Sequence, residues 1–329
     1  MQHYKKLQIF IVLSILFLAG CKKDNNPVVP DTKWEKINLG VEARAVYDLQ
    51  VYNSTIFAGT DSGICISSDK GKTWNNYNTT GKRLNIKKIF FDNNIIYVGT
   101  KDAGVYVSYD FGVNWTPMNT GIQASIATIY PEISSFISDS NYIYAGLPSI
   151  SLNTPKPSQI YRKRIDQDKW ESFDSSLEAI GIRAFYKYEG RIYAGTWEGI
   201  YVFEPVLSKW IKFGESNLSF VRFYTKKTSL FCSVEQQNIG MMISSNGGYS
   251  WRSSNTGIGS DDIVWSFSED IKNNIYCTSY GKVFSSSGEG NTWIKIGDGL
   301  PQESILSSVV VNNNIFVGSN WNGVWVFKL

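Results

Sequence analysis

Histidine is almost absent from this chain of 329 residues, which contains only His3. His3 lies in an N-terminal segment that we predict is removed. The mature protein would then have no imidazole for a Ser/His/Asp or Cys/His arrangement or for a zinc site.

An excess of one charge is also lacking: the formal net charge is +3, and loss of Lys5 and Lys6 with that segment lowers it to +1. A near-neutral chain without a Lys/Arg cluster argues against a nucleic-acid partner. We also expect no metal and no cofactor.

Cysteine is rare as well. Besides Cys21 there are only Cys65, Cys232 and Cys277. Three cysteines without a short spacing do not indicate a disulfide framework. Cys232 and Cys277 occupy a position that alanine fills in other copies of a repeat, which favours small buried hydrophobic side chains over a bridge. Their oxidation state stays open.

Helical periodicity is missing throughout, which favours an all-β fold.

The first twenty residues have the organisation of an export signal. The basic pair Lys5-Lys6 precedes an apolar run over residues 7–18 that is short for a transmembrane helix. The following L-A-G-C, ending at Cys21, resembles a bacterial lipobox. The resemblance implies cleavage before Cys21 and diacylation of its sulfur; an ordinary signal peptide is the alternative. The expected segments are a signal peptide at 1–20, a lipidated polar tether at 21–31 and a folded domain at 32–329.

The residue after Cys21 bears on the membrane to which the lipid would attach. It is Lys22, not the Asp that marks inner-membrane retention in enteric bacteria. We therefore expect an exported outer-membrane lipoprotein, held by the lipid at Cys21 and facing either the periplasm or the exterior.

Two short signatures alternate along the chain, and each occurs seven times. The first is a β-rich run such as Ile56-Phe57-Ala58-Gly59-Thr60, with further copies beginning at Ile96, Ile143, Ile192, Leu230, Ile275 and Ile315. The second is a tryptophan, at Trp34, Trp74, Trp115, Trp170, Trp210, Trp251 and Trp293. Most intervals are about 40 residues, the length of a four-stranded propeller blade.

Each repeat is predicted to form four short strands, A to D, with strand A innermost. In the first repeat these are Ala45–Val51, Thr55–Thr60, Gly63–Ser67 and Trp74–Tyr77. Their β-branched and aromatic residues suit half-buried pleated strands. Small polar pairs such as Asn53-Ser54 suit the tight turn between strands A and B.

The two ends of the chain complement each other. The last repeat stops after its strand C, around Gly323–Phe327, while Trp34–Ile37 is a strand D with no blade before it. Joining them would complete the seventh blade and remove two open sheet edges. The sequence therefore predicts one all-β domain, a seven-bladed β-propeller of four-stranded antiparallel blades, closed by an N-terminal strand.

The stretch Ser67-Ser68-Asp69-Lys70-Gly71-Lys72-Thr73-Trp74 lies on the predicted C-to-D turn. It resembles the Asp-box, or BNR repeat, of sialidase-like and sortilin-like propellers and of photosystem II assembly factors. The copy from Ser108 to Trp115 departs only at Asn114, and two later copies have Asn246 and Gly288 at the Asp position. The resemblance covers essentially the whole mature chain.

A structural role accounts for this motif. The Asp can accept hydrogen bonds from its own turn, the Gly can take a positive φ, and the Trp can bury its ring. No single catalytic or calcium site could use copies at equivalent turns of several blades. The residues to which we assign this structural role are Ser67, Asp69, Gly71, Trp74, Asp110, Gly112 and Trp115.

Loop lengths indicate which side of the propeller binds a ligand. Because successive strands are antiparallel, the D-to-A and B-to-C loops share one side, called here the D–A/B–C face. The third repeat is lengthened only on this face, around 121–134 and 148–158. Insertions confined to one face commonly mark a binding face.

The B-to-C loops of this face also have an unusual composition. Exposed tryptophan beside polar groups could form a stacking platform for a sugar or a hot spot for a protein. The alternative is that Trp197 and Trp321 only cover the ends of neighbouring blades. The candidate ligand-binding residues in these loops are Asp61, Lys101, Asp102, Trp197, Glu198, Tyr280, Asn320 and Trp321.

Two arginines lie at or near the start of a predicted strand A, Arg44 and Arg183. If both pointed into the central channel, they could bind a carboxylate bidentately. The alternative is a solvated position at the rim.

We expect a monomeric, lipid-anchored, extracytoplasmic propeller that binds a protein or glycan through the D–A/B–C face without catalysis. One alternative is a sialidase-like glycoside hydrolase or lyase acting on polysaccharide, but the eight arginines are scattered and Arg44 lacks the F/Y-R-I-P setting of that family. Another is an assembly or maturation factor, by fold resemblance alone. Spacing does not select two carboxylates for glycoside hydrolysis from Asp61, Asp102, Glu198, Asp261 and Asp262.

Overall fold

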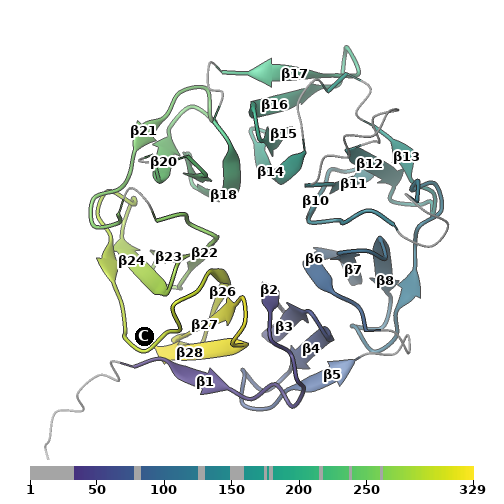
Figure 1. Ribbon diagram of the computed structural model, residues 1–329. Helices are drawn as coiled ribbons and strands as arrows, with labels where there is room; N and C mark the ends of the chain where they lie inside the picture. The colour runs from purple at the N-terminus through teal and green to yellow at the C-terminus, as the bar shows by residue number, and fades with distance from the viewer. Residues whose placement is uncertain are drawn as a thin grey trace, which may run out of the picture. The chain divides into compact units, whose positions relative to one another are not determined.

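The protein is described by a computed structural model over residues 33–77, 83–124, 130–148, 159–173, 176–177, 181–214, 218–236, 239–259 and 262–329. Its strands form seven four-stranded antiparallel sheets. Figure 1 shows the sheets as blades around a central axis, with β2, β6, β10, β14, β18, β22 and β26 innermost. The predicted seven-bladed propeller is confirmed. Within the described residues there is no helix that is long and apolar enough to span a membrane.

The first four blades follow the chain in order, each with its innermost strand first. Blade 1 comprises β2 (Val46–Tyr52), β3 (Thr55–Thr60), β4 (Gly63–Ser67) and β5 (Asn75–Tyr77). Blade 2 comprises β6 (Ile86–Asp92), β7 (Ile95–Thr100), β8 (Val105–Ser108) and β9 (Thr116–Pro117). Blade 3 comprises β10 (Ser135–Ser138), β11 (Tyr142–Gly146), β12 (Ile160–Arg164) and β13 (Glu171–Ser172). Blade 4 comprises β14 (Ile182–Tyr188), β15 (Arg191–Thr196), β16 (Gly199–Glu204) and β17 (Lys209–Phe213).

The remaining blades include the one that joins the two ends of the domain. Blade 5 comprises β18 (Phe220–Lys226), β19 (Ser229–Val234), β20 (Met241–Ser244) and β21 (Arg252–Ser253). Blade 6 comprises β22 (Ser266–Glu269), β23 (Asn274–Ser279), β24 (Lys282–Ser287) and β25 (Ile294–Lys295). Blade 7 comprises β26 (Ile305–Val311), β27 (Asn314–Ser319), β28 (Val324–Lys328) and, from the other end of the chain, β1 (Glu35–Ile37).

Strand β1 closes the ring as predicted. It pairs antiparallel with β28, with Lys36 opposite Trp325. The Trp34 indole N–H donates to the Ile296 carbonyl (3.3 Å), and the Trp34 ring packs against that of Phe327. The innermost strand β2 then contacts both β6 and β26, so no blade is left with an uncovered side.

The hydrophobic core is a series of layers between adjacent blades. In one layer Phe57 and Ile64 of blade 1 pack with Ile86 and Ile96 of blade 2, all of them almost fully buried. Glycine in the second strand lets the blades approach this closely: a Cβ added to Gly59 would lie 2.8 Å from Cγ2 of Ile86. The recurring Ala-Gly pair of the β-rich runs is therefore explained by packing between blades.

The Ser67–Trp74 motif forms the turn between β4 and β5. The Ser67 hydroxyl donates to Asp69 (2.9 Å) and accepts from the Gly71 N–H (2.8 Å). Asp69 also accepts from the N–H and hydroxyl of Thr73. The Trp74 indole N–H donates to the Gly71 carbonyl, and the ring is buried. All these bonds lie within the turn, so Ser67, Asp69 and Thr73 serve its local structure.

We predict that Ser67→Ala destabilises the domain by about 1–3 kcal/mol, because the buried N–H of Gly71 would lose its acceptor. Urea unfolding measured by fluorescence checks this. The matched control is Ser68→Ala, because Ser68 is exposed and should change the unfolding free energy by less than about 0.5 kcal/mol. Equal effects of the two substitutions would contradict the role given to the hydroxyl.

A second prediction concerns pH. Hydrogen bonds from the Thr73 hydroxyl and then its N–H lower the pKa of Asp69 to about 2. Since the pKa of Asp in an unfolded chain is about 3.9, the stabilisation by the carboxylate is complete above that value and is lost as the pH falls through about 2. The difference in melting temperature between wild type and Asp69→Ala should therefore be constant near neutrality and shrink below about pH 4.

Asp69→Asn provides the control for this pH series. In the corresponding turn of blade 5, Asn246 already accepts from the Ser244 hydroxyl and the Ser250 N–H. The amide should therefore retain more of the melting temperature at neutral pH than alanine does. A wild-type to Asp69→Ala difference that stayed constant down to pH 2 would show that the carboxylate charge does not matter.

Candidate ligand-binding face

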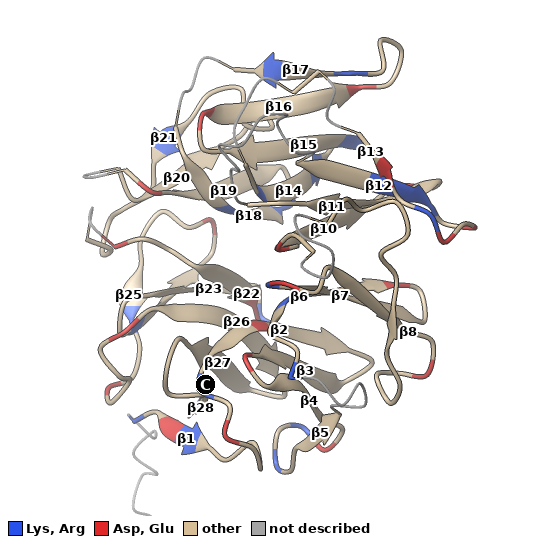
Figure 2. Ribbon diagram, turned by 45° about the vertical axis from the view of Figure 1, so that its right-hand side comes forward, with Lys and Arg blue, Asp and Glu red and all other residues tan. Residues whose placement is uncertain are grey.

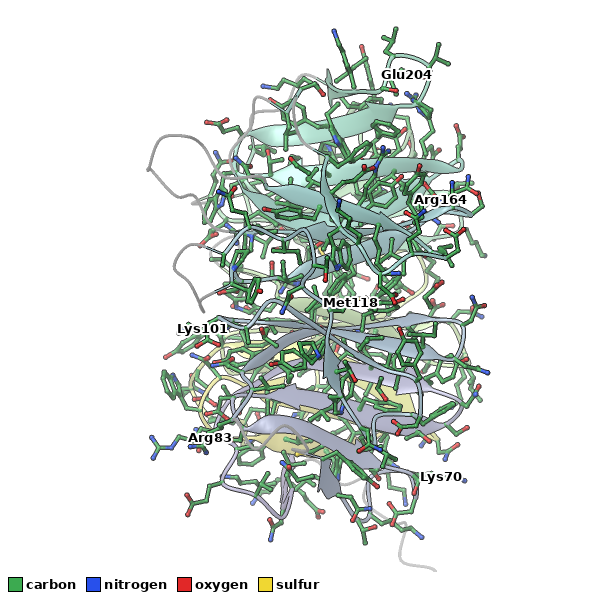
Figure 3. The ribbon with its side chains drawn as sticks, turned by 90° about the vertical axis from the view of Figure 1, so that its right-hand side faces the viewer. Lys70, Arg83, Lys101, Met118, Arg164 and Glu204 are labelled. Atoms are coloured by element: carbon green, nitrogen blue, oxygen red, sulfur yellow. The ribbon has the colours of Figure 1, made fainter. Side chains whose placement is uncertain are left out.

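The two faces of the propeller carry different features. Figure 3 shows the ring edge-on, with Arg83 and Lys101 on one side and Lys70, Arg164 and Glu204 on the other. Lys101 lies between the second and third strands of its blade, so its side is the D–A/B–C face. The predicted loop residues all lie between such strand pairs: Asp61, Lys101, Asp102, Trp197, Glu198, Tyr280, Asn320 and Trp321.

Trp197 lies in the B-to-C loop of blade 4 and contacts the corresponding loop of blade 3. Its ring is 40% exposed, and its indole N–H donates to the Pro148 carbonyl (3.3 Å). The guanidinium of Arg183 stacks on the ring, 3.8 Å from its centroid, and forms an ion pair with Glu235. Glu235 follows β19, so neighbouring blades together fix this aromatic side chain. The cation covers one ring face, and 40% of the residue surface remains accessible.

Trp321 and Tyr280 flank the loop that joins blades 6 and 7. Their side chains are 62% and 54% exposed. The Glu303 carboxylate accepts from the backbone N–H groups of Trp321 and Asn322, both at 3.1 Å, which fixes the loop that carries Trp321. Tyr280 forms an antiparallel bridge with Ser304, next to Glu303. Two exposed aromatic side chains are thus presented by a well-bonded backbone.

The structure places Arg44 and Arg183 in separate parts of the ring, each with contacts of its own. Arg44 lies in blade 1 and Arg183 in blade 4, with blades 2 and 3 between them. Arg44 is exposed and interacts through its backbone, whose N–H donates to Asp61 and whose carbonyl accepts from Gly323. Arg183 is already paired with Glu235. Sequence spacing could not reveal these positions, because equivalent strand starts are spread around the ring.

The mouth of the channel holds a charged cluster that the sequence did not indicate. The Lys87 ammonium lies over the Tyr47 ring, 3.5 Å from its centroid. Burial lowers the pKa of Lys87 and raises that of Glu132. A carboxyl group with a raised pKa is a property of general acids. The one available signal was that Glu132 is the only acidic residue in the 121–134 insertion.

Strand irregularities explain why Tyr47 and Lys87 lie at this mouth. The pairing of β2 with β3 shifts between Val46 and Asp48, and that of β6 with β7 shifts between Ile86 and Lys88. Each shift leaves one extra residue, Tyr47 or Lys87, in a bulge. Bulges re-aim side chains near the ends of strands. The bulges thereby turn Tyr47 and Lys87 toward the channel, whereas regular strand pairing would point these side chains elsewhere.

Several carboxylates of this face already have partners. Asp61 accepts from the Arg44 N–H and the Ser62 hydroxyl. Asp262 is buried and pairs with the Lys282 ammonium at 3.0 Å. Its sequence neighbour Asp261 lies outside the described residues. Asp102 and Glu198 lie in separate loops, in blades 2 and 4. Asp61 and Asp262, two of the carboxylates considered for glycoside hydrolysis, therefore already have structural partners.

The three cysteines of the domain are free thiols in different blades, and all are buried. Burial raises the pKa of Cys65 to about 11 and also raises those of Cys232 and Cys277. Such thiols are poor nucleophiles and metal ligands at neutral pH. The predicted lipidation site, Cys21, lies outside the described residues.

Comparison with known proteins gives similarity of fold. No family model matches the sequence, and no curated protein matches it. Among solved structures, the extracellular domain of the B. thetaiotaomicron two-component-system protein BT4673 aligns with a TM-score of 0.69 at 16% identity, over 91% of this chain and 40% of that one. YCF48 bound to D1 peptide aligns with a TM-score of 0.64 at 12% identity, over 93% and 99%.

A third similar structure is an enzyme, GH74 from Niastella koreensis. It aligns with a TM-score of 0.66 at 14% identity, over 89% of this chain and 53% of the enzyme. The chain thus spans only part of BT4673 and of the enzyme, but nearly all of YCF48. What it shares with the three is the β-propeller fold.

Proposed function

We propose that this protein is an exported, lipid-anchored propeller that binds a protein or glycan through the D–A/B–C face and has no catalytic activity of its own. The observation that carries the proposal is the set of three exposed aromatic side chains on that face, Trp197, Tyr280 and Trp321. Aromatic anchors on a fixed backbone lose little conformational entropy on binding and supply large contact areas.

The export signal and lipid anchor rest on the N-terminal sequence. A basic start, an apolar run and the L-A-G-C ending at Cys21 support cleavage and diacylation. The similar fold of an extracellular domain from B. thetaiotaomicron agrees with an extracytoplasmic location. Acidic and basic residues are scattered over the blades in Figure 2, which suits a partner other than nucleic acid.

Rigid support of the aromatics favours binding over accidental exposure. Trp197 is fixed by Pro148 and Arg183, and the Trp321 loop is fixed by Glu303. The contacts at Trp197 also fit a cap over the ends of adjacent blades, which is the alternative role. Whether or not Trp197 also covers the blade ends, a ligand would contact the exposed part of each ring.

We predict that Trp321→Ala and Tyr280→Ala weaken glycan or protein binding by about thirtyfold or more, because hot-spot residues contribute about 2 kcal/mol or more. The measurement is a glycan array, followed by titration of any hit, with residues 31–329, which contain all seven blades. Trp197→Ala is expected to act in the same direction.

The matched controls are Tyr109→Ala and Tyr249→Ala. These tyrosines are 60% and 56% exposed, on turns of the opposite face. A protein ligand is tested in cells by photo-crosslinking from position 321 or 280, with positions 109 and 249 as controls. The proposal would be contradicted if substitutions on the two faces weakened binding equally, or if crosslinking from positions 109 and 249 matched that from positions 321 and 280.

A second candidate function, polysaccharide hydrolysis or elimination, is favoured by one observation. Burial raises the pKa of Glu132, which interacts electrostatically with the ammonium groups of Lys87 and Lys101. The GH74 enzyme shares the fold, though at 14% identity. A role as an assembly factor is a further alternative. It rests on similarity of fold to YCF48, which was solved bound to D1 peptide.

An activity assay separates binding from catalysis. We expect neither the wild type nor Glu132→Gln to release reducing ends or unsaturated sugars from a panel of acidic and neutral polysaccharides, while both retain equal ligand binding. Wild-type cleavage that is abolished by Glu132→Gln would replace the proposal with the enzymatic alternative. Asp139→Asn, on the opposite face, serves as the matched carboxyl control.

A further inference from the structure

The inner strands bring one equivalent residue of every blade to a common level of the channel. Each of these residues pairs with the fourth position of the β-rich run in its own blade, for example Asp48 with Gly59 and Arg222 with Ser233. We call this set the channel ring. Its members are Asp48, Lys88, Ser135, Ala184, Arg222, Ser266 and Ser307.

Two charged members of the ring neutralise each other. The Lys88 ammonium lies 3.0 Å from the Asp48 carboxylate. Asp48 also accepts from the Ile89 N–H and the Gln50 amide, so both of its oxygens are used. Farther along the channel, Glu269 is neutralised by Lys226 at 2.9 Å. Asp48 and Glu269, the two acidic residues that line the cavity described below, therefore already have cationic partners.

Arg222 has no such partner. Its one hydrogen bond to the described part of the chain runs from Nη1 to the carbonyl of Val221 (2.9 Å), and no described carboxylate lies within ion-pair distance. A guanidinium carries five N–H donors. Burial lowers the pKa of Arg222, Asp48 raises it, and the nearby Arg183 lowers it again. Arg222 is thus a cation in the channel without a carboxylate partner among the described residues, and most of its N–H donors form no hydrogen bond to that part of the chain.

The space beside Arg222 is large enough for a ligand. A cavity of about 340 Å³ is lined by Arg222 and Lys88 on one part and by Ser266, Ser268 and Ser308 on another. The Ser308 hydroxyl lies 3.0 Å from both Ser266 and Ser268. Hydroxyl groups can rotate to donate to an anion. The volume far exceeds the roughly 30 Å³ occupied by one water molecule.

We propose that Arg222 binds a small oxyanion in the central channel, with the serine hydroxyls as further donors. The guanidinium fork matches two oxygens of one carboxylate, phosphate or sulfate group. Binding would give this half-buried cation an anionic partner that no described residue supplies. Arg222 is the third residue of β18, so the site lies near the end of the channel at the D–A/B–C face. The inference is independent of the aromatic side chains and of their ligand.

Calorimetric titration of the purified protein tests the site. Acetate, phosphate and sulfate are compared with chloride at constant ionic strength, which also distinguishes the three oxyanions. We expect saturable binding of at least one oxyanion by the wild type and none beyond the chloride background by Arg222→Met. Arg222→Lys, which keeps the charge but loses the fork, should bind about tenfold more weakly.

The matched control is Arg191→Met, which removes an exposed arginine that pairs with Glu204 at the opposite face. It should bind like the wild type. Circular dichroism confirms that each variant is folded, and Ser266→Ala, a smaller change, provides a second test with a weaker but measurable loss. Absence of saturable oxyanion binding in the wild type, or equal binding by Arg222→Met, would overturn the proposal.

Discussion

The pairing of β1 with β28 is the contact on which the rest of the molecule depends. A blade buries both of its faces only against two neighbours, and the hydrophobic layers, such as that between Phe57 and Ile86, consist of residues from two blades each. Without β1, the outer edge of blade 7 would be unpaired, and the Trp34 ring would not pack against Phe327. Closure by this strand brings Trp34 next to Phe327 and joins the seven repeats into one compact unit.

Ring closure also restricts where function can develop. Close packing between blades fixes the strands. A Cβ atom added to Gly59 would lie only 2.8 Å from Cγ2 of Ile86. The turns of one face are occupied by hydrogen-bonded motifs such as that of Ser67 and Asp69. On the D–A/B–C face the repeated motif is smaller: the hydroxyl that ends the second strand, as in Thr60 or Ser319, donates to a loop carbonyl and accepts a loop N–H, while the outer loop residues differ between blades. Variation there changes the surface without disturbing the layers, which explains why the exposed Trp321 and Tyr280 are found on it.

The channel is a consequence of the same geometry. Seven inner strands cannot pack against a common centre, so their first residues border a space whose lining is set by bulges and by register. Within it Asp48 and Lys88 neutralise each other, whereas Arg222 has no carboxylate partner in the part of the chain that the structure describes. The propeller therefore has two distinct regions open to ligands, an aromatic surface and a polar channel, built from different parts of each blade.

The sequence alone determined the blade count, the strands and the closure, because β-rich runs, tryptophans and the split last repeat are local patterns that recur. It also placed Trp197 and Trp321 on one face, since antiparallel strands fix which loops lie together. Tertiary structure decided the rest. Whether Arg44 and Arg183 meet, which carboxylate pairs with Lys88, and how burial changes the pKa of Glu132 depend on contacts between blades that are distant in the chain. Such contacts leave no periodic trace in the sequence, because each occurs only once around the ring.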